Sequence, residues 1–181
     1  TQIRRNGRGD KAMISTITIT QVKELLINAG IDASVVTDYI NYLEQSNPGL
    51  AESLSDHFSG RNASITPVFI YREANRQIVT ILANDSDCPD EPGEPGSILA
   101  YVRQYGHGDS FMCSDCYGQL SCSSCAVEVL SGTCENPTPR EEEYDMLDID
   151  ELRPPTELTR LGCQAVVGKE PLVIKIRSFG S

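Results

Sequence analysis

Four cysteines constrain this chain more than any other feature of its sequence. Cys116, Cys122 and Cys125 stand with five and two residues between them, and Cys163 follows after 37 more. Four thiolates are the ligands that a [2Fe–2S] cluster requires, two on each iron. Gly118 and three serines lie within this spacing, so backbone amides can turn toward cluster sulfurs and donate hydrogen bonds. The spacing therefore predicts an iron–sulfur site on these four cysteines.

Other uses of the cysteines stay open at this point. Zinc also binds four cysteines, but structural zinc sites usually combine two short Cys-x2-4-Cys knuckles, and Cys163 has no such companion. Disulfides would leave one of the seven cysteines unpaired, and bridges at x2 spacing are strained. Cys113 makes a further Cys-x2-Cys with Cys116 and could act as a redox partner or an alternative ligand, but we interpret it as a neighbour of the ligands, because the other four cysteines already satisfy a cluster. We interpret Cys88 and Cys134 as free thiols.

Residues 13–60 predict a small all-α module, preceded by a polar, basic and flexible tail over residues 1–12. Apolar residues recur at i, i+3, i+4 and i+7, the spacing of one helix face. Asp32 and Asn47 are suited to cap the second and third helices, and Gly30 to end the first. So short a module exposes more apolar surface than it can bury alone, and we expect it to pack on the second domain, a twin subunit or a partner. The apolar stretches are Val22–Ala29, Val36–Leu43 and Leu50–Phe58.

Residues 61–181 predict a second domain that mixes strands and helices. Alternating residues over Ile65–Tyr71 and Ile78–Leu82 predict a β-hairpin. Ser97 is suited to cap a short helix that Gly106 ends. Further elements are expected as a strand at Ala126–Leu130, an acidic helix at Arg140–Leu147 and a final strand at Leu172–Ile176.

The net charge of −11 is spread unevenly along the chain. Residues 61–181 carry 10 Lys and Arg against 19 Asp and Glu, whereas residues 1–60 carry 5 against 7. An acidic surface repels nucleic acid and anionic membranes and favours a basic protein partner. No apolar run approaches the roughly 20 residues that cross a bilayer, and no apolar stretch directly follows the basic N-terminus as in a secretory signal. We therefore expect a soluble protein located in the cytoplasm.

The stretch from Cys116 to Cys125, CYGQLSCSSC, resembles the cluster loop of adrenodoxin-type, or iron–sulfur-assembly-type, [2Fe–2S] ferredoxins. Plant-type ferredoxins have four residues in the first gap instead of five. The resemblance continues through Asp145–Asp148 and Arg160–Gln164, and it covers residues 63–181. It implies an α+β protein with a β-grasp ferredoxin domain, in which a mixed sheet packs on a helix. The helical module at residues 13–60 is an addition that typical members lack.

The resemblance also implies a function. Ferredoxins of this type are one-electron carriers, not enzymes: they accept an electron from a flavin-containing reductase and pass it to an oxygenase or to the iron–sulfur assembly machinery. In the family, the acidic helix before the fourth cysteine docks basic partners. A merely solvated helix face is the plainer interpretation of such a charge run. The matching positions here are Glu142, Glu143, Asp145 and Asp148.

Two hypotheses address the helical module. In the first, it is a docking or dimerisation element, so that the protein forms a homodimer or delivers electrons to one partner. In the second, the protein is an iron–sulfur redox-sensing regulator whose helices bind DNA or another protein. Because Lys23 is the single basic residue on the three predicted helices, the charge disfavours nucleic acid as the ligand.

Overall fold

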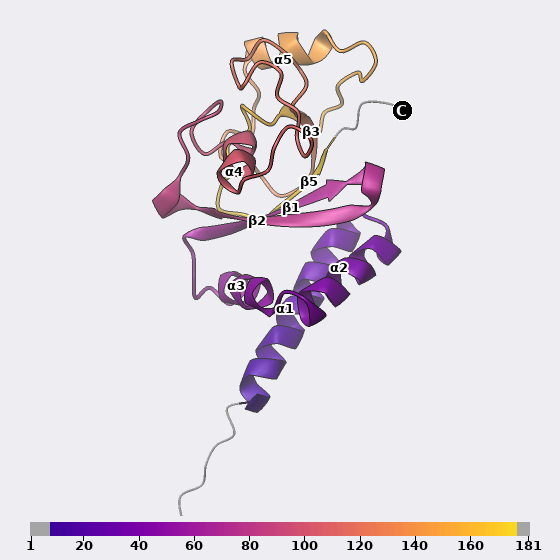
Figure 1. Ribbon diagram of the computed structural model, residues 1–181, viewed down its shortest axis with the longest axis vertical. Coiled ribbons are helices and arrows are strands. Elements are labelled where there is room, and N and C mark those ends of the chain that lie inside the picture. Colours follow the sequence, from indigo (N-terminus) through magenta and orange to yellow (C-terminus); the bar gives the residue numbers. More distant parts are fainter. Residues whose placement is uncertain (1–7, 177–181) are drawn as a thin grey trace, which may run out of the picture. The chain divides into compact units, whose positions relative to one another are not determined.

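The computed structural model describes the backbone of residues 8–176 and the side chains of residues 16–176. The chain divides into two compact units, residues 1–62 and 63–181, which places the division two residues beyond the boundary predicted from the sequence. Figure 1 shows the order of the elements along the chain. In the described part of the chain, no helix combines the length and the apolar character that crossing a membrane requires.

Three helices form the first unit, and each contacts the other two. The Asp32 side chain accepts a hydrogen bond from the Ser34 amide at 2.8 Å, and the Asn47 side chain accepts one from the Leu50 amide at 3.1 Å. These caps satisfy amides that have no partner within their own helix, as the sequence predicts. Fully buried side chains, among them Val22, Leu26, Val36, Leu43 and Leu54, form the core of the unit. The helices are α1 (Arg8–Asn28), α2 (Ala33–Gln45) and α3 (Pro48–Phe58).

Helix α1 begins earlier than the sequence predicts. Residues 8–12 are helical, so the flexible tail predicted over residues 1–12 is wrong for this part, and residues 1–7 lie outside the described residues. No apolar spacing marks residues 8–12, but a helix that has already formed extends readily because each added residue gains a hydrogen bond. As a result, Arg8 and Lys11 join Lys23 as basic residues of the helical module.

The second unit contains a five-stranded mixed sheet in the order β2-β1-β5-β3-β4. The predicted hairpin is present as an antiparallel pair, β1 with β2, in register from Ile65 opposite Asn84 to Arg72 opposite Gln77. Strand β1 also pairs with β5 in parallel, while β3 pairs antiparallel with both β5 and β4. The strands are β1 (Ile65–Arg72), β2 (Gln77–Asn84), β3 (Ala126–Ser131), β4 (Thr159–Leu161) and β5 (Leu172–Ile176).

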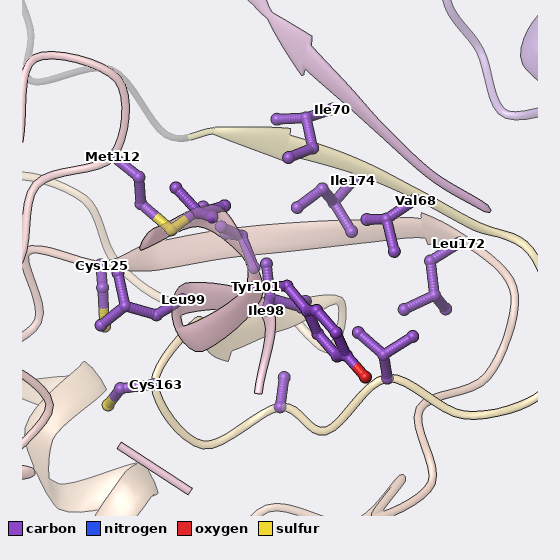
Figure 2. Close-up of a cluster of buried hydrophobic side chains, with 14 of the residues drawn as sticks. Val68, Ile70, Ile98, Leu99, Tyr101, Met112, Cys125, Cys163, Leu172 and Ile174 are labelled. Carbon is purple, nitrogen blue, oxygen red and sulfur yellow. The ribbon is translucent and has the colours of Figure 1, made fainter. Parts of the chain in front are cut away.

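One face of this sheet is covered by α4 (Ile98–Gln104), which Ser97 caps by accepting a hydrogen bond from the Ala100 amide at 3.1 Å. Figure 2 shows Ile98, Leu99 and Tyr101 of this helix among side chains from the strands. A second helix, α5 (Glu141–Asp148), contacts β4. The mixed sheet and its helix form the α+β, β-grasp architecture that the sequence predicts.

Candidate metal centre

The four predicted ligands come from two places in the chain that the sheet brings together. Cys125 directly precedes β3, and Cys163 stands two residues after the end of β4. These strands pair with Ala126 opposite Leu161, and the Gly162 amide donates a hydrogen bond to the Cys125 carbonyl at 2.9 Å. The pairing of two short strands therefore places the fourth cysteine beside the third.

Cys125 and Cys163 form a buried pair at the edge of the core, close to Leu99 and Met112 (Figure 2). The contact between the two thiols, together with burial, raises the pKa of Cys125, and the same contact lowers the pKa of Cys163. The Gln164 side chain adds a second donor, with its Nε2 3.5 Å from the Cys163 sulfur. The contacts with Cys125 and Gln164 lower the pKa of Cys163 against the opposing effect of burial.

Cys116 and Cys122 form a second pair, on the half-buried side of the loop. Burial acts to raise the pKa of Cys116, but hydrogen bonds from the Ser121 backbone, the Cys122 and Ser121 side chains and the Gln119 backbone outweigh it. Their combined effect lowers this pKa from 9.0 to about 7. The tight loop therefore holds its first cysteine ready to act as a thiolate, the form that binds metal.

The two pairs lie within electrostatic range of each other. After larger contributions from the Cys125–Cys163 contact and burial, a charge on Cys116 raises the pKa of Cys163 and a charge on Cys122 raises that of Cys125. In the part of the chain that the structure describes, no three His, Cys, Asp or Glu side chains gather around a single ion position. Two neighbouring pairs of sulfurs fit a cluster in which each iron takes two cysteines.

Two glycines let three backbone segments meet at this site. A Cβ atom on Gly93 would lie 2.3 Å from the Cys163 carbonyl oxygen, and one on Gly118 would lie 2.3 Å from the Gly93 nitrogen. Both residues have positive φ, 81° and 78°. Because any side chain would collide with backbone, only glycine permits the loop after Cys116 to close against the segment that contacts Cys163. This close approach brings the loop after Cys116 next to Cys163.

The remaining cysteines do not join these pairs. The Cys113 sulfur donates to the Asp115 carboxylate at 3.3 Å, and burial followed by Asp115 raises the pKa of this thiol. Cys88 is exposed, and Cys134 is buried, which raises its pKa. This arrangement supports the sequence-based interpretation of Cys113 as a neighbour of the ligands.

The acidic helix α5 does not expose all four carboxylates predicted to dock a partner. Glu142, Asp145 and Asp148 are exposed, but the side chain of Glu143 is only 2% exposed and makes an ion pair with Arg160. The docking role predicted for Glu143 is therefore wrong, because this carboxylate faces the interior. Its place in an acidic run hid this, since nothing in the sequence separates it from its exposed neighbours.

A buried polar network around Arg160 was not predicted from the sequence. Arg160 donates to the Asn136 carbonyl at 2.9 Å, and the Asn136 side chain donates to the Gln164 carbonyl at 2.7 Å and accepts from the Val166 amide at 2.9 Å. These bonds connect the residues before and after Cys163 in the chain to Asn136. The only signal in the sequence was Arg160 itself, within the Arg160–Gln164 motif.

Arg103 organises the loop that leads to the first ligand, and it too was not predicted. From α4, its guanidinium donates to the carbonyls of His107 and Met112, both at 2.9 Å, and to the Ser114 hydroxyl at 2.8 Å, and it also pairs with Asp109. A single arginine thus fixes the path of the chain from the end of α4 to the cysteine loop.

Comparison with known proteins shows that part of this chain is similar to a family of iron–sulfur proteins. Residues 83–168 match the family described as 2Fe-2S iron-sulfur cluster binding domain. Rhodocoxin from Rhodococcus erythropolis is 41% identical over 66 residues, which are 36% of this chain and 61% of rhodocoxin, so the match spans less than two thirds of that relative.

The matches to solved structures extend over nearly all of each solved chain. An ISC-like [2Fe-2S] ferredoxin from Pseudomonas putida is 25% identical with a TM-score of 0.46, covering 63% of this chain and 94% of its own. A ferredoxin from Rhodopseudomonas palustris is 18% identical with a TM-score of 0.45, covering 64% and 99%. Residues 83–168, which include the four predicted ligands, are thus similar to 2Fe-2S iron-sulfur cluster binding domains.

Proposed function

We propose that this protein is a one-electron carrier whose [2Fe–2S] cluster is bound by Cys116, Cys122, Cys125 and Cys163. The observation that carries the proposal is the backbone geometry around the cysteines: the pairing of β3 with β4 sets Cys125 beside Cys163, and the approach of Gly118 to Gly93 brings the Cys116 loop to the same place. Four cysteines held in this way support two thiolates on each iron. A bound cluster supplies the chemistry, which is the uptake and release of a single electron.

The protein residues shape the environment of that chemistry. The Cys125–Cys163 side is buried against the core and excludes water, whereas Cys116 and Cys122 are only half buried. The Ser124 hydroxyl lies 3.1 Å from the Cys122 sulfur, and Gln164 lies near that of Cys163. Donors to sulfur stabilise the more negative reduced state and raise the reduction potential. The exposed side of the loop is the side through which an electron would enter and leave.

A basic partner protein is proposed to dock on α5 beside this loop. Glu142, Asp145 and Asp148 are exposed on one short helix, and such a cluster of like charges accelerates the encounter with an oppositely charged protein. The proposed partners are a flavin-containing reductase as electron donor and an oxygenase or an iron–sulfur assembly protein as acceptor. The cytoplasmic location expected from the sequence stays a prediction.

The helical module is proposed to serve docking or dimerisation. Ile17, Ile27 and Tyr42 are large apolar or aromatic side chains that stay exposed on α1 and α2. Their exposure supports a contact with another molecule but does not identify it. Sedimentation of the full chain and of residues 63–181 compares the oligomeric states directly.

The function is tested by reductive titration followed by electron transfer. We expect the full-length protein to take up one electron per chain and to be reduced catalytically by NAD(P)H through an adrenodoxin-type flavoprotein reductase. Reduction by dithionite without any electron transfer from a flavoprotein would support a sensing role. If the protein takes up no electron at all, both the carrier role and the sensing role are contradicted.

A further inference from the structure

The turn that follows α5 exposes two large aliphatic side chains next to a buried one. Leu147 is inside the core, yet Ile149 is 67% exposed and Leu152 is 94% exposed. Scattered apolar residues on a surface are ordinary, but two in one four-residue turn of an acidic region form a local apolar patch. We call Ile149 and Leu152 the apolar turn.

This turn is held in place rather than left free to move. The Arg153 guanidinium pairs with the Asp150 carboxylate at 2.6 Å, and these side chains are only 10% and 13% exposed. The Arg153 amide also donates to that carboxylate at 3.1 Å. The Ser123 hydroxyl donates to it at 3.5 Å, and Ser123 lies between two of the cluster-binding cysteines. The exposed side chains are thus presented on a braced segment attached to the cysteine loop.

The apolar turn continues the acidic face of α5. Ile149 keeps a helical backbone at the end of α5, with φ −67° and ψ −24°. Residues at i, i+3 or i+4 and i+7 share a helix face, so Glu142, Asp145 and Ile149 form one stripe. Among ion pairs between described residues, none involves Glu142, Asp145 or Asp148. Exposed negative charge therefore borders the apolar turn.

We propose that Ile149 and Leu152 are the apolar anchor of the surface that receives the electron-transfer partner, and that this partner presents an apolar patch bordered by basic side chains. The inference rests on the proposed electron-carrier function and deepens it. An apolar centre with a charged rim is the usual anatomy of a protein interface, and anchors on a braced segment lose little conformational entropy on binding. The acidic residues accelerate the encounter with the partner, while the apolar turn slows dissociation and so lengthens the lifetime of the complex next to the cluster loop.

The test uses full-length, cluster-loaded protein and cytochrome c, a basic haem protein, as the probe. The variant Ile149→Ser/Leu152→Ser retains every charge, and its residues are exposed, so we expect it to fold. Leu158→Ser is the matched control, because Leu158 is also an exposed leucine but lies before β4, where its carbonyl accepts from the Val129 amide. Stopped-flow measurement gives the rate of electron transfer to cytochrome c, its concentration dependence and its salt dependence. Ferricyanide serves as a small oxidant that needs no docking.

We expect the double variant to require about fivefold to tenfold more cytochrome c for half-maximal rate, with an unchanged salt slope and an unchanged rate with ferricyanide. The control should match the wild-type protein. If the double variant matches the wild type with cytochrome c, or if its rate with ferricyanide falls equally, the apolar anchor is refuted while the carrier function stands. If the wild-type protein reduces neither oxidant, the carrier function itself fails.

Discussion

Arg160 and Glu143 form a bidentate ion pair in the interior, with Nε 2.8 Å from Oε1 and the second guanidinium nitrogen 3.1 Å from Oε2. The same carboxylate accepts the Leu161 amide at 2.8 Å. Through these bonds α5 is fastened to β4, two residues before the last cysteine of the site. The side chains of Arg160 and Glu143 are only 6% and 2% exposed, so removing one partner leaves a buried charge without compensation.

Replacing Glu143 should therefore destabilise the domain strongly. We expect Glu143→Gln to lower the free energy of unfolding by about 3 kcal/mol or more, measured by urea denaturation of the cluster-loaded protein. Asp145→Asn is the control on the same helix, where the exposed carboxylate should change stability by less than about 0.5 kcal/mol. The double variant Glu143→Leu/Arg160→Met should recover much of the loss, and equal stability of Glu143→Gln and wild type would contradict the role of the pair.

The helix caps could be predicted from the sequence, whereas the burial of Glu143 could not. The sequence predicts the caps at Asp32, Asn47 and Ser97 because each depends on one side chain and an amide two or three residues away. Strand β4 was not predicted because three residues are too few to show an alternating pattern, and this strand forms through pairing with β3. Burial of Glu143 likewise depends on Arg160, far along the chain.

The metal site likewise has features that the sequence predicts and others that it does not. The spacing of the cysteines predicts four ligands, because few metal groups use such a pattern, and the pairing of β3 with β4 places Cys163 beside Cys125. Its supporting contacts could not be predicted, since Arg103 and Asn136 act through backbone carbonyls and amides of distant loops. The backbone approach at Gly93 is equally a product of the three-dimensional fold.

Arg103 offers a second prediction, about the loop before Cys116. We expect Arg103→Met to leave three or more acceptors without their donor, to lower the free energy of unfolding by about 2 kcal/mol and to shorten the lifetime of the cluster under chelation. The decay of visible absorbance in excess chelator measures this lifetime. Arg61→Met is the control, because Arg61 makes an exposed ion pair with Asp56 in the other unit. Equal decay in both variants would show that Arg103 does not position the loop.

Docking through charge predicts a loss of salt dependence. The variant Glu142→Gln/Asp145→Asn/Asp148→Asn changes the net charge from −11 to −8, since three carboxylates are removed (−11 + 3). We expect electron transfer to cytochrome c to slow about tenfold at low ionic strength and to converge with wild type at high salt.

A matched control separates docking from total charge. Glu24→Gln/Asp38→Asn/Glu44→Gln removes three exposed carboxylates of α1 and α2 and also gives −8. If this control slows the transfer as much as the α5 variant does, net charge alone governs the encounter and α5 is not the docking surface.

The ligand assignment predicts opposite effects for two buried cysteines. Cys163→Ser should abolish or destabilise the cluster, because its sulfur is one of the four proposed ligands. Cys134→Ser should retain the visible spectrum, because the Cys134 thiol is buried outside the two cysteine pairs. Loss of iron from Cys134→Ser with retention in Cys163→Ser would reverse the assignment.

The most direct test of the account is a single set of measurements on anaerobically purified protein: the content of iron, sulfide and zinc, with visible and electron paramagnetic resonance spectra before and after dithionite. We predict two irons and two sulfides per chain, with a one-electron rhombic or axial signal that appears on reduction. A colourless protein that contains zinc and gives no signal would contradict it.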